Sequence, residues 1–321
     1  MLTRWWHYVL AVALGMLVVA AALAGLASAL IYPNLPSLEA LTDYRPKMPL
    51  RIYTEDGALV GEFGEERRAF VRIQDTPATL KQAILAAEDD RFYQHGGVDT
   101  LGIARAALAN LMAGGAKEGA STITMQVARN FFLSSEKTLR RKVNEALLAL
   151  KIEHSLSKDQ ILELYINQIY LGQRAYGFAA AAQTYFGKPL DKITLAEAAM
   201  LAGLPKAPSA YNPVVNPDRA RTRQLYVLRR MRELGYIDAT RYQEAVAQHL
   251  GVRHSTASTD LNADHIAELA RQYVVQRYGE QAYVSGMKVY TTLRSAEQKA
   301  ALEGVRLGVV AYNRRHGYTG P

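Results

Sequence analysis

Cysteine is absent from the 321 residues of this chain. Its absence excludes disulfides, zinc–thiolate and iron–sulfur centres and a thiol nucleophile, although it does not identify a redox compartment. Charge is absent from the 25 residues between Tyr8 and Tyr32, which are almost entirely apolar. A helix of that length can cross a hydrocarbon core of about 30 Å, so the sequence predicts a transmembrane anchor over residues 8–32.

The charges that flank this run predict the orientation of the chain. Arg4 precedes the run, whereas Glu39 and Asp43 are the first charges after it, so the positive-inside rule places the N-terminus in the cytoplasm. A cleaved signal peptide ending near residues 27–29 is the alternative, but its apolar core usually spans only about 7–15 residues. We therefore expect a single-pass protein of the cytoplasmic (inner) membrane, with its folded part on the outer, periplasmic side.

The remaining composition is that of a folded, basic protein. Hydrophobic residues make up 49% of the chain and charged residues 21%, which argues against disorder. The net charge is +8, a balance that suits nucleic acid, an anionic membrane or a phosphorylated substrate. A folded part held outside the membrane argues against nucleic acid as the partner.

Turn and periodicity signals predict a small β element followed by helices. Residues 51–73 alternate around Asp56-Gly57 and predict a β-hairpin. The pattern becomes helical at Thr76-Pro77, with Thr76 as the expected N-cap, and stays helical to about residue 250. A polar linker at 254–260, a helix at 264–277 and a strand at 287–293 are expected to follow. We therefore predict an anchor with its cytoplasmic tip at 1–32, a proline-rich linker at 33–50, a main domain at 51–250 and a linker with the start of a connector at 251–321.

A glutamate in the stretch AEDDRFYQHGGVD, residues 87–99, is the first candidate for catalysis. Glu88 falls four residues after Ile84, on the apolar face of its predicted helix, so its carboxylate is expected to point inward or into a cleft. A partly desolvated glutamate has a raised pKa and can exchange a proton near neutral pH. A structural ion pair with Arg91 or Lys81 is the alternative interpretation.

A candidate anion site follows in GASTITMQVARN, residues 119–130. Ser121 can cap a helix whose free N–H groups, together with neighbouring hydroxyls, would suit a phosphate, although capping alone is a common alternative. The basic residues that come next suit a diphosphate or form a solvated helix face: Arg129, Lys137, Arg140, Arg141 and Lys142. Glu145 lies four residues beyond Arg141, a spacing that an ordinary helical salt bridge also explains.

Two further helices carry polar residues that need interpretation. Residues 101–115 form a mostly apolar helix interrupted by Arg105 and Asn110, and the sequence leaves open whether it is a core helix or a segment that dips into the bilayer. Glu163 and Asn167 lie one helical turn apart, and we interpret both as structural polar groups.

The order of five motifs is more specific than any one of them. EDDRFYQHGGVD, GASTITMQ, RKVNEALLALKIE, ILELYINQIYLG with YFGK, and LAEAAMLAGLPKAPSAYNP resemble, in this order, the sequence blocks of the family 51 peptidoglycan glycosyltransferases. The resemblance is dense over residues 77–213. Members of this family are single-function transglycosylases or N-terminal modules of class A penicillin-binding proteins. The resemblance implies a mainly α, lysozyme-like fold with a membrane-associated lobe near residues 101–115, to which the chain adds the transmembrane helix and the small β-hairpin.

The resemblance also implies roles for individual residues. Glu88 corresponds to the general base and Glu145 to the second family glutamate. The implied substrate-binding residues are Ser121, Thr122, Thr124, Gln126, Arg129, Lys137, Arg141 and Lys142. Ala120 and Met125 depart from the common family pattern GGSTITQQ, which puts only the detailed hydrogen bonding in doubt. A divalent cation, Mg²⁺ or Mn²⁺, is implied by the family alone, because no metal-ligand spacing in the sequence requires it.

The implied activity is polymerisation of lipid II into β-1,4-linked glycan with inversion and release of undecaprenyl diphosphate. The implied partners are lipid II, the growing glycan chain, the membrane and other cell-wall synthesis proteins. Residues 287–305 and 313–321 resemble the connector of class A, type 1a, penicillin-binding proteins, so transpeptidation is not expected from these residues. A lysozyme-like hydrolase or lytic enzyme is one alternative, and an inactive membrane-anchored glycan-binding scaffold is another. The basic cluster argues against the first, and the presence of both glutamates argues against the second.

Overall fold

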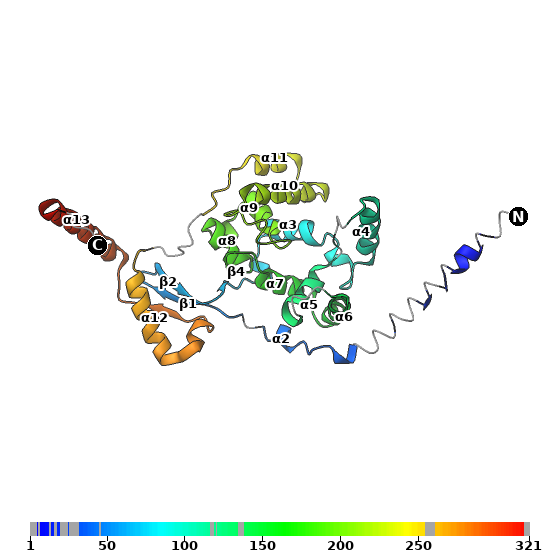
Figure 1. Cartoon of the computed structure of the whole chain (residues 1–321), viewed down its shortest axis with the longest axis horizontal. Coiled ribbons are helices and arrows are strands. Elements are labelled where there is room, and N and C mark those ends of the chain that lie inside the picture. Colours follow the sequence, from blue (N-terminus) through cyan, green and yellow to red (C-terminus); the bar gives the residue numbers. More distant parts are fainter. Residues whose placement is uncertain are drawn as a thin grey trace. The chain divides into compact units, whose positions relative to one another are not determined.

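The computed structural model describes residues 5, 7–12, 14–15, 18–19, 25, 32–44, 46–115, 119, 121–133, 138–253 and 261–317. This part of the chain is mainly helical, as the sequence predicts, and Figure 1 labels most of its helices and three of its strands, β1, β2 and β4. Two compact units are present: unit 1 comprises residues 1–44 and 91–165, and unit 2 comprises residues 45–90 and 166–321.

Unit 1 is built from helices. They are α2 (Glu39–Thr42), α4 (Thr100–Met112), α5 (Ile123–Phe132), α6 (Leu139–Ser155) and most of α7 (Lys158–Gln168). α5 packs against α6, and Val127 and Leu148 are among the apolar side chains buried there. The helix that was expected to be capped by Ser121 is capped by Thr122, whose hydroxyl accepts the Met125 N–H at 3.2 Å. The predicted cap is therefore wrong by one residue.

The helical part of unit 2 centres on α9. Its helices are α3 (Ala78–Glu88), α8 (Phe178–Phe186), α9 (Leu195–Gly203), α10 (Pro217–Glu233) and α11 (Ala239–Ala247). α9 packs against both α3 and α10, which also pack against each other. The sequence LAEAAMLAG is apolar on almost every side, and this is why α9 is buried along its length. α3 begins one residue later than predicted, and the Thr76 hydroxyl donates to the Arg72 carbonyl instead of capping the helix.

Unit 2 also contains a sheet with the strand order β2-β1-β5. β1 (Leu50–Tyr53) and β2 (Leu59–Phe63) form the predicted antiparallel hairpin, and β5 (Lys288–Tyr290) joins β1 in parallel, with Ile52 opposite Val289. Outside this sheet, β3 (Arg67–Arg68) pairs in parallel with β4 (Ala175–Tyr176).

The hairpin shares a hydrophobic core with the end of the chain. α12 (Asp264–Tyr278) packs on β1 and β2, as Figure 1 shows, and its Ala267 and Val274 join Ile52 and Val60 in one buried cluster. α13 (Ser295–His316) follows β5. This grouping of distant segments was not expected from the sequence, and the predicted domain boundaries stay a prediction. The polar linker at 254–260 lies outside the described residues.

The N-terminal run on which the anchor was predicted, residues 8–32, lies largely outside the described residues. Of the helices that the structure describes, none is both long enough and apolar enough to cross a membrane. The transmembrane anchor therefore stays a prediction.

Candidate active site

Glu88 is the last residue of α3, and only 11% of its side chain is exposed. Its Oε1 lies 3.7 Å from Nη2 of Arg223 in α10, so the carboxylate has a buried cationic partner. The alternative interpretation, in which Glu88 forms an ion pair with Arg91 or Lys81, does not agree with the structure. Arg91 lies 3.3 Å from Asp99, and the Lys81 ammonium donates to a backbone carbonyl at 3.4 Å.

Glu145 is the most enclosed carboxylate of the candidate site, with 2% of its side chain exposed. It is held by residues of its own helix, α6: Arg141 contacts Oε1, and the Lys142 ammonium lies 2.9 Å from Oε2. The same ammonium donates to the Ser121 hydroxyl at 2.6 Å. Three of the residues implied by the resemblance are thus joined to Glu145 in one network within unit 1.

The network carries an excess of positive charge. Burial, followed by the nearby guanidinium groups of Arg129 and Arg141, lowers the pKa of Lys142 below that of an ordinary lysine. Repulsion between cations is therefore a feature of the site, and an anion placed among them would relieve it. A single carboxylate, Glu145, offsets part of this charge in the protein itself. The arrangement fits an anionic group such as a diphosphate.

Three of the predicted substrate-binding residues are buried. Thr122 donates its hydroxyl to the Gly97 carbonyl at 2.6 Å, and Thr124 donates to Glu153 at 2.6 Å. Gln126 is 6% exposed. Glu153, which the sequence did not single out, also accepts from the Lys158 ammonium at 2.7 Å. These contacts hold α5 in place, and contact of the three residues with substrate stays a prediction.

Position 97, in the HGGVD turn, requires glycine because the backbone there lies very close to α6. Its φ is +93°, and a Cβ at this position would lie 2.8 Å from the Ala149 carbonyl oxygen. Only glycine meets both conditions without strain. Its carbonyl is the acceptor of the Thr122 hydroxyl, so the first motif and the second motif are in contact at this residue.

Lys137 and Asn167 are two further residues for which the sequence analysis predicts a role. Lys137 lies outside the described residues. Asn167 is structural, as interpreted from the sequence, because its side chain accepts from the Val71 N–H at 2.9 Å and donates to the Val71 carbonyl at 2.8 Å.

The apolar helix that the sequence left ambiguous is exposed. Ala106 is the one residue of α4 that is buried, whereas Leu111 and Met112 are 80% and 81% exposed. An ordinary core helix would bury these side chains, so the core interpretation is wrong. Exposed apolar side chains gathered on one helix are typical of a surface that contacts a membrane or a partner.

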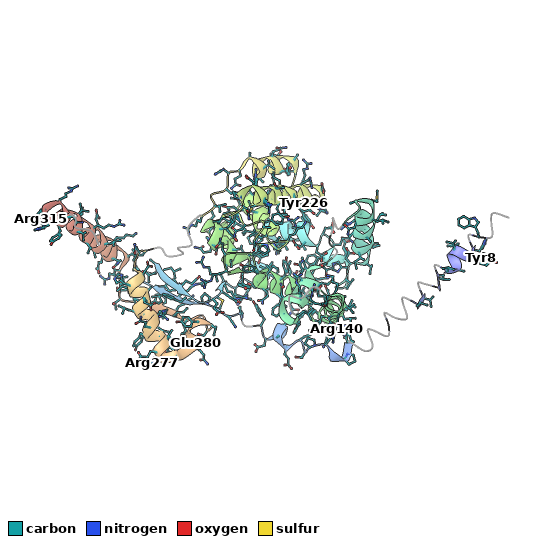
Figure 2. All side chains as sticks on the ribbon, in the orientation of Figure 1. Tyr8, Arg140, Tyr226, Arg277, Glu280 and Arg315 are labelled. Carbon is teal, nitrogen blue, oxygen red and sulfur yellow. The ribbon has the colours of Figure 1, made fainter. Side chains whose placement is uncertain are left out.

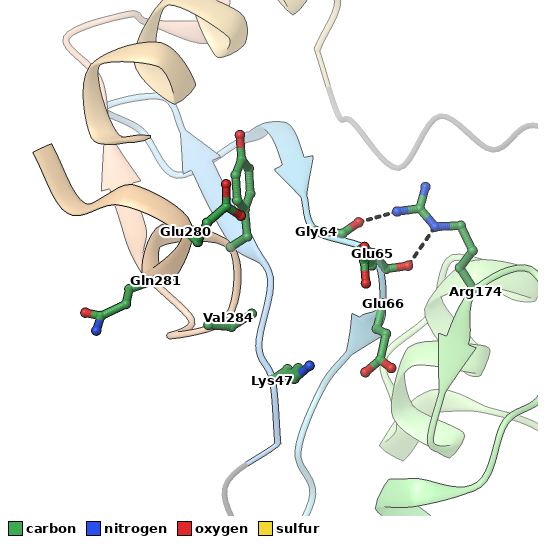
Figure 3. A pocket seen from close by; sticks show the side chains of 9 residues that line it. Lys47, Gly64, Glu65, Glu66, Arg174, Glu280, Gln281 and Val284 are labelled. Carbon is green, nitrogen blue, oxygen red and sulfur yellow. Dashed lines mark hydrogen bonds between the residues drawn. The ribbon is translucent and has the colours of Figure 1, made fainter. Parts of the chain in front are cut away.

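A hollow of about 640 Å³ lies elsewhere in unit 2 (Figure 3). Glutamates line it together with Lys47 and Arg174, and Arg174 donates to the carbonyls of Gly64 and Glu65. None of the predicted site residues lines this hollow. The carboxylates and cations of the motifs form two groups, one around Glu88 in unit 2 and one around Glu145 in unit 1.

Residues 56–232, more than half of the chain, match the family model of the transglycosylases, and the chain belongs to this family. Penicillin-binding protein 1A of Neisseria flavescens is 57% identical over 289 residues, which cover 90% of this chain and 36% of that protein. Penicillin-binding protein 1A of Pseudomonas aeruginosa is 53% identical over 289 residues, covering 90% and 35%. The crystal structure of penicillin-binding protein 1A from Haemophilus influenzae is 35% identical, with a TM-score of 0.47, and covers 86% of this chain and 31% of that one. The chain thus spans little more than a third of the length of these curated relatives.

Proposed function

We propose that this chain is a peptidoglycan glycosyltransferase that polymerises lipid II into β-1,4-linked glycan. The observation that carries the proposal is the network of Ser121, Lys142, Arg141 and Glu145, found in a chain of the transglycosylase family. A hydrolase has no need of a cluster of cations beside its carboxylate, whereas a transferase that expels a diphosphate does.

Glu88 acts as the general base in this proposal. It takes the proton from the 4-hydroxyl of the N-acetylglucosamine of an incoming lipid II, and the oxygen attacks the anomeric carbon of the lipid-linked growing chain. One carbon–oxygen bond forms while the bond to the diphosphate breaks, and the bonding electrons leave with undecaprenyl diphosphate. Attack from the opposite face converts the α-linked sugar into a β-linked one, so the reaction is inverting.

Negative charge grows on the diphosphate as it leaves. Arg129, Arg141 and Lys142 supply fixed positive charge, which stabilises the transition state more than the ground state. Glu145 holds two of these cations in place and limits their repulsion before substrate arrives. Lys137 belongs to the same proposed set.

The divalent cation implied by the family remains a separate proposal. Within the described residues, no group of three or more carboxylate and histidine side chains gathers in a way that could hold a metal ion. Glu145 is engaged by two cationic side chains. These donors do not form a protein metal site, and no step of the mechanism is derived through a metal.

We further propose that the enzyme works at the outer face of the cytoplasmic membrane. The charge-free run at 8–32 is the proposed anchor, and the exposed apolar side chains of α4 are proposed to contact the acyl chains next to the lipid-linked substrate. The proposed partners are lipid II, the growing glycan and other cell-wall synthesis proteins. Residues 251–321 are proposed to begin the connector to a transpeptidase domain, by analogy with the class A enzymes.

Polymerisation of labelled lipid II by residues 1–321 tests the function, with products separated by length. We expect wild type to make long glycan and Glu88→Gln to bind lipid II but make none. Asp191→Asn removes the same charge from a side chain that is 63% exposed and should leave the rate unchanged. Shortening of added glycan by wild type would indicate the hydrolase, and binding without polymer would indicate the scaffold. Rapid polymerisation by Glu88→Gln would move the general base to another residue.

A further inference from the structure

Arg223 is the buried arginine of α10, with 8% of its side chain exposed. Four groups surround its guanidinium. Nη2 faces the Glu88 carboxylate, and the Nε–H donates to the Gly203 carbonyl at 3.4 Å. The guanidinium carbon also lies 4.5 Å from the ring centroid of Tyr226 and 6.0 Å from that of Tyr211. Figure 2 labels Tyr226 on α10. A planar cation held at its edge and its face has little freedom to turn away from Glu88.

The stem of Arg223 is confined as closely as its head. Gly203 is the last residue of α9, and a Cβ at this position would lie 2.9 Å from Cγ of Arg223. Glycine thus leaves room for the arginine stem to pass the end of α9. The position of the guanidinium therefore depends on α9, on α10 and on the ring of Tyr226 together.

Glu88 needs support from outside its own helix. It is the last residue of α3, and Asp89 after it has an extended backbone with φ of −162°. The side chain of Glu88 leans back over the preceding turn of α3, and contacts from other helices determine where its carboxylate lies beyond that turn. Arg223 is such a neighbour, and it approaches from a different helix.

A second arginine of α10 provides a comparison. Arg230 lies seven residues after Arg223, hence on the same side of the helix, and its Nη2 is 2.9 Å from the carboxylate of Asp90. Both arginines join α10 to the C-terminal end of α3, but only Arg223 does so through Glu88. If these ion pairs served packing alone, replacing either arginine would change the stability of the protein but not the reaction.

We infer that Arg223 is a positioning residue for the general base: it fixes the direction and the charged state of the Glu88 carboxylate. The inference rests on the proposed function, because it assigns Glu88 that role. Arg223 acts through Glu88 and not on the substrate. Among the other charged groups on the packed elements, Asp90 pairs with Arg230, and Glu197 of α9 pairs with Lys188 at 2.7 Å.

The test compares Arg223→Lys and Arg223→Gln with Arg230→Gln, in full-length protein in detergent. Lysine keeps the charge but lacks the planar fork that reaches both Glu88 and the Gly203 carbonyl, so we expect kcat for lipid II polymerisation to fall about tenfold with KM unchanged within about twofold. For Arg223→Gln we expect kcat to fall about 100-fold. The acid limb of its pH–rate profile should move to higher pH, because a carboxylate that loses a nearby cation binds its proton more readily.

The control variant separates positioning from packing. Arg230→Gln should also lower thermal stability, though less than Arg223→Gln because Arg230 is 25% exposed and Arg223 8%, but leave kcat within about twofold and the pH–rate profile in place. Gly203→Ala supplies a second route, because its methyl group displaces the Arg223 stem without changing any charge. It should lower kcat without shifting the acid limb as far as Arg223→Gln does.

A readout that needs no turnover separates this inference from the proposed function. The ¹³C signal of the Glu88 carboxyl, assigned by its loss in Glu88→Gln, should titrate at higher pH in Arg223→Gln than in wild type. An unchanged titration, or the same kinetic changes in Arg230→Gln, overturns the role of Arg223 even if wild type polymerises lipid II. If wild type makes no glycan but the titration of Glu88 shifts as expected, the proposed function is overturned. The coupling of Arg223 to Glu88 is then still established.

Discussion

Replacing Glu145 by glutamine should weaken the fold of unit 1 while strengthening its hold on an anion. The substitution keeps the shape of the side chain and removes the charge that faces Arg141 and Lys142. Removing one partner of a fully buried ion pair costs about 3–5 kcal/mol. Here the exposed fractions are 2% for Glu145 but 16% for Arg141 and 43% for Lys142, so water partly compensates the cations.

We therefore expect a loss of about 2 kcal/mol in the free energy of unfolding, because the glutamine carbonyl also retains one acceptor. A change of this size lowers the melting temperature by about 4–8 °C when the roughly 200 residues of the main domain, 51–250, unfold together. Loss of the negative charge should also increase the attraction of the site for inorganic diphosphate by about 1 kcal/mol, or about fivefold in Kd.

Circular dichroism at increasing temperature measures the first effect, and titration calorimetry with inorganic diphosphate measures the second. Asp191→Asn is the matched control, because it makes the same change of net charge at an exposed ion pair and should alter stability by less than about 0.5 kcal/mol. Weaker diphosphate binding by Glu145→Gln, or an unchanged melting temperature, would refute the view that Glu145 stabilises the cations and competes with the anion.

Two further predictions concern residues of unit 1. Because burial and neighbouring cations lower the pKa of Lys142, its proton is lost at a lower pH than that of an ordinary lysine. The affinity for diphosphate, measured by calorimetry, should therefore decline in wild type as the pH rises toward the range in which an ordinary lysine titrates. In Lys142→Arg the affinity should stay constant over the same range. The same pH dependence in wild type and in Lys142→Arg would exclude Lys142 from the anion site. The chain has no cysteine, so Met112→Cys can be labelled with a nitroxide at this one position. In vesicles the label should be accessible to oxygen and protected from a polar relaxation agent, because Met112 lies on the exposed apolar helix α4. A label on Asp191→Cys should show the reverse. A water-exposed label at Met112 would contradict membrane contact by α4.

Local patterns were enough to predict most elements. The hairpin around Asp56-Gly57, the helix that became α12 and the strand that became β5 all follow from periodicity and turn residues that act over a few positions. The pairing of β1 with β5 could not be predicted this way. Two strands separated by more than 200 residues carry no sign in their own sequences of which strand each will join.

The candidate site shows the same division. Contacts within α6, such as Lys142 with Glu145, follow from helical spacing and were expected as ordinary salt bridges. Spacing along the sequence predicts partners for Glu88 only among nearby residues, whereas Arg223 is brought to it by the packing of α10. Arg223 and Arg230, seven residues apart on a basic helix, were the available signal, but a solvated charged face has the same pattern.

The parallel pairing of β1 with β5 also determines how the chain responds to mechanical tension. Residues 48–55 and 284–293 run alongside each other, with backbone hydrogen bonds such as Met48 N–H to the Val284 carbonyl and Glu55 N–H to the Leu293 carbonyl. A pull applied before β1 and after β5 loads these bonds in shear, so they resist together instead of opening one by one. The load is therefore carried by the paired strands, and the segment that connects β1 to β5 is not in series with these bonds.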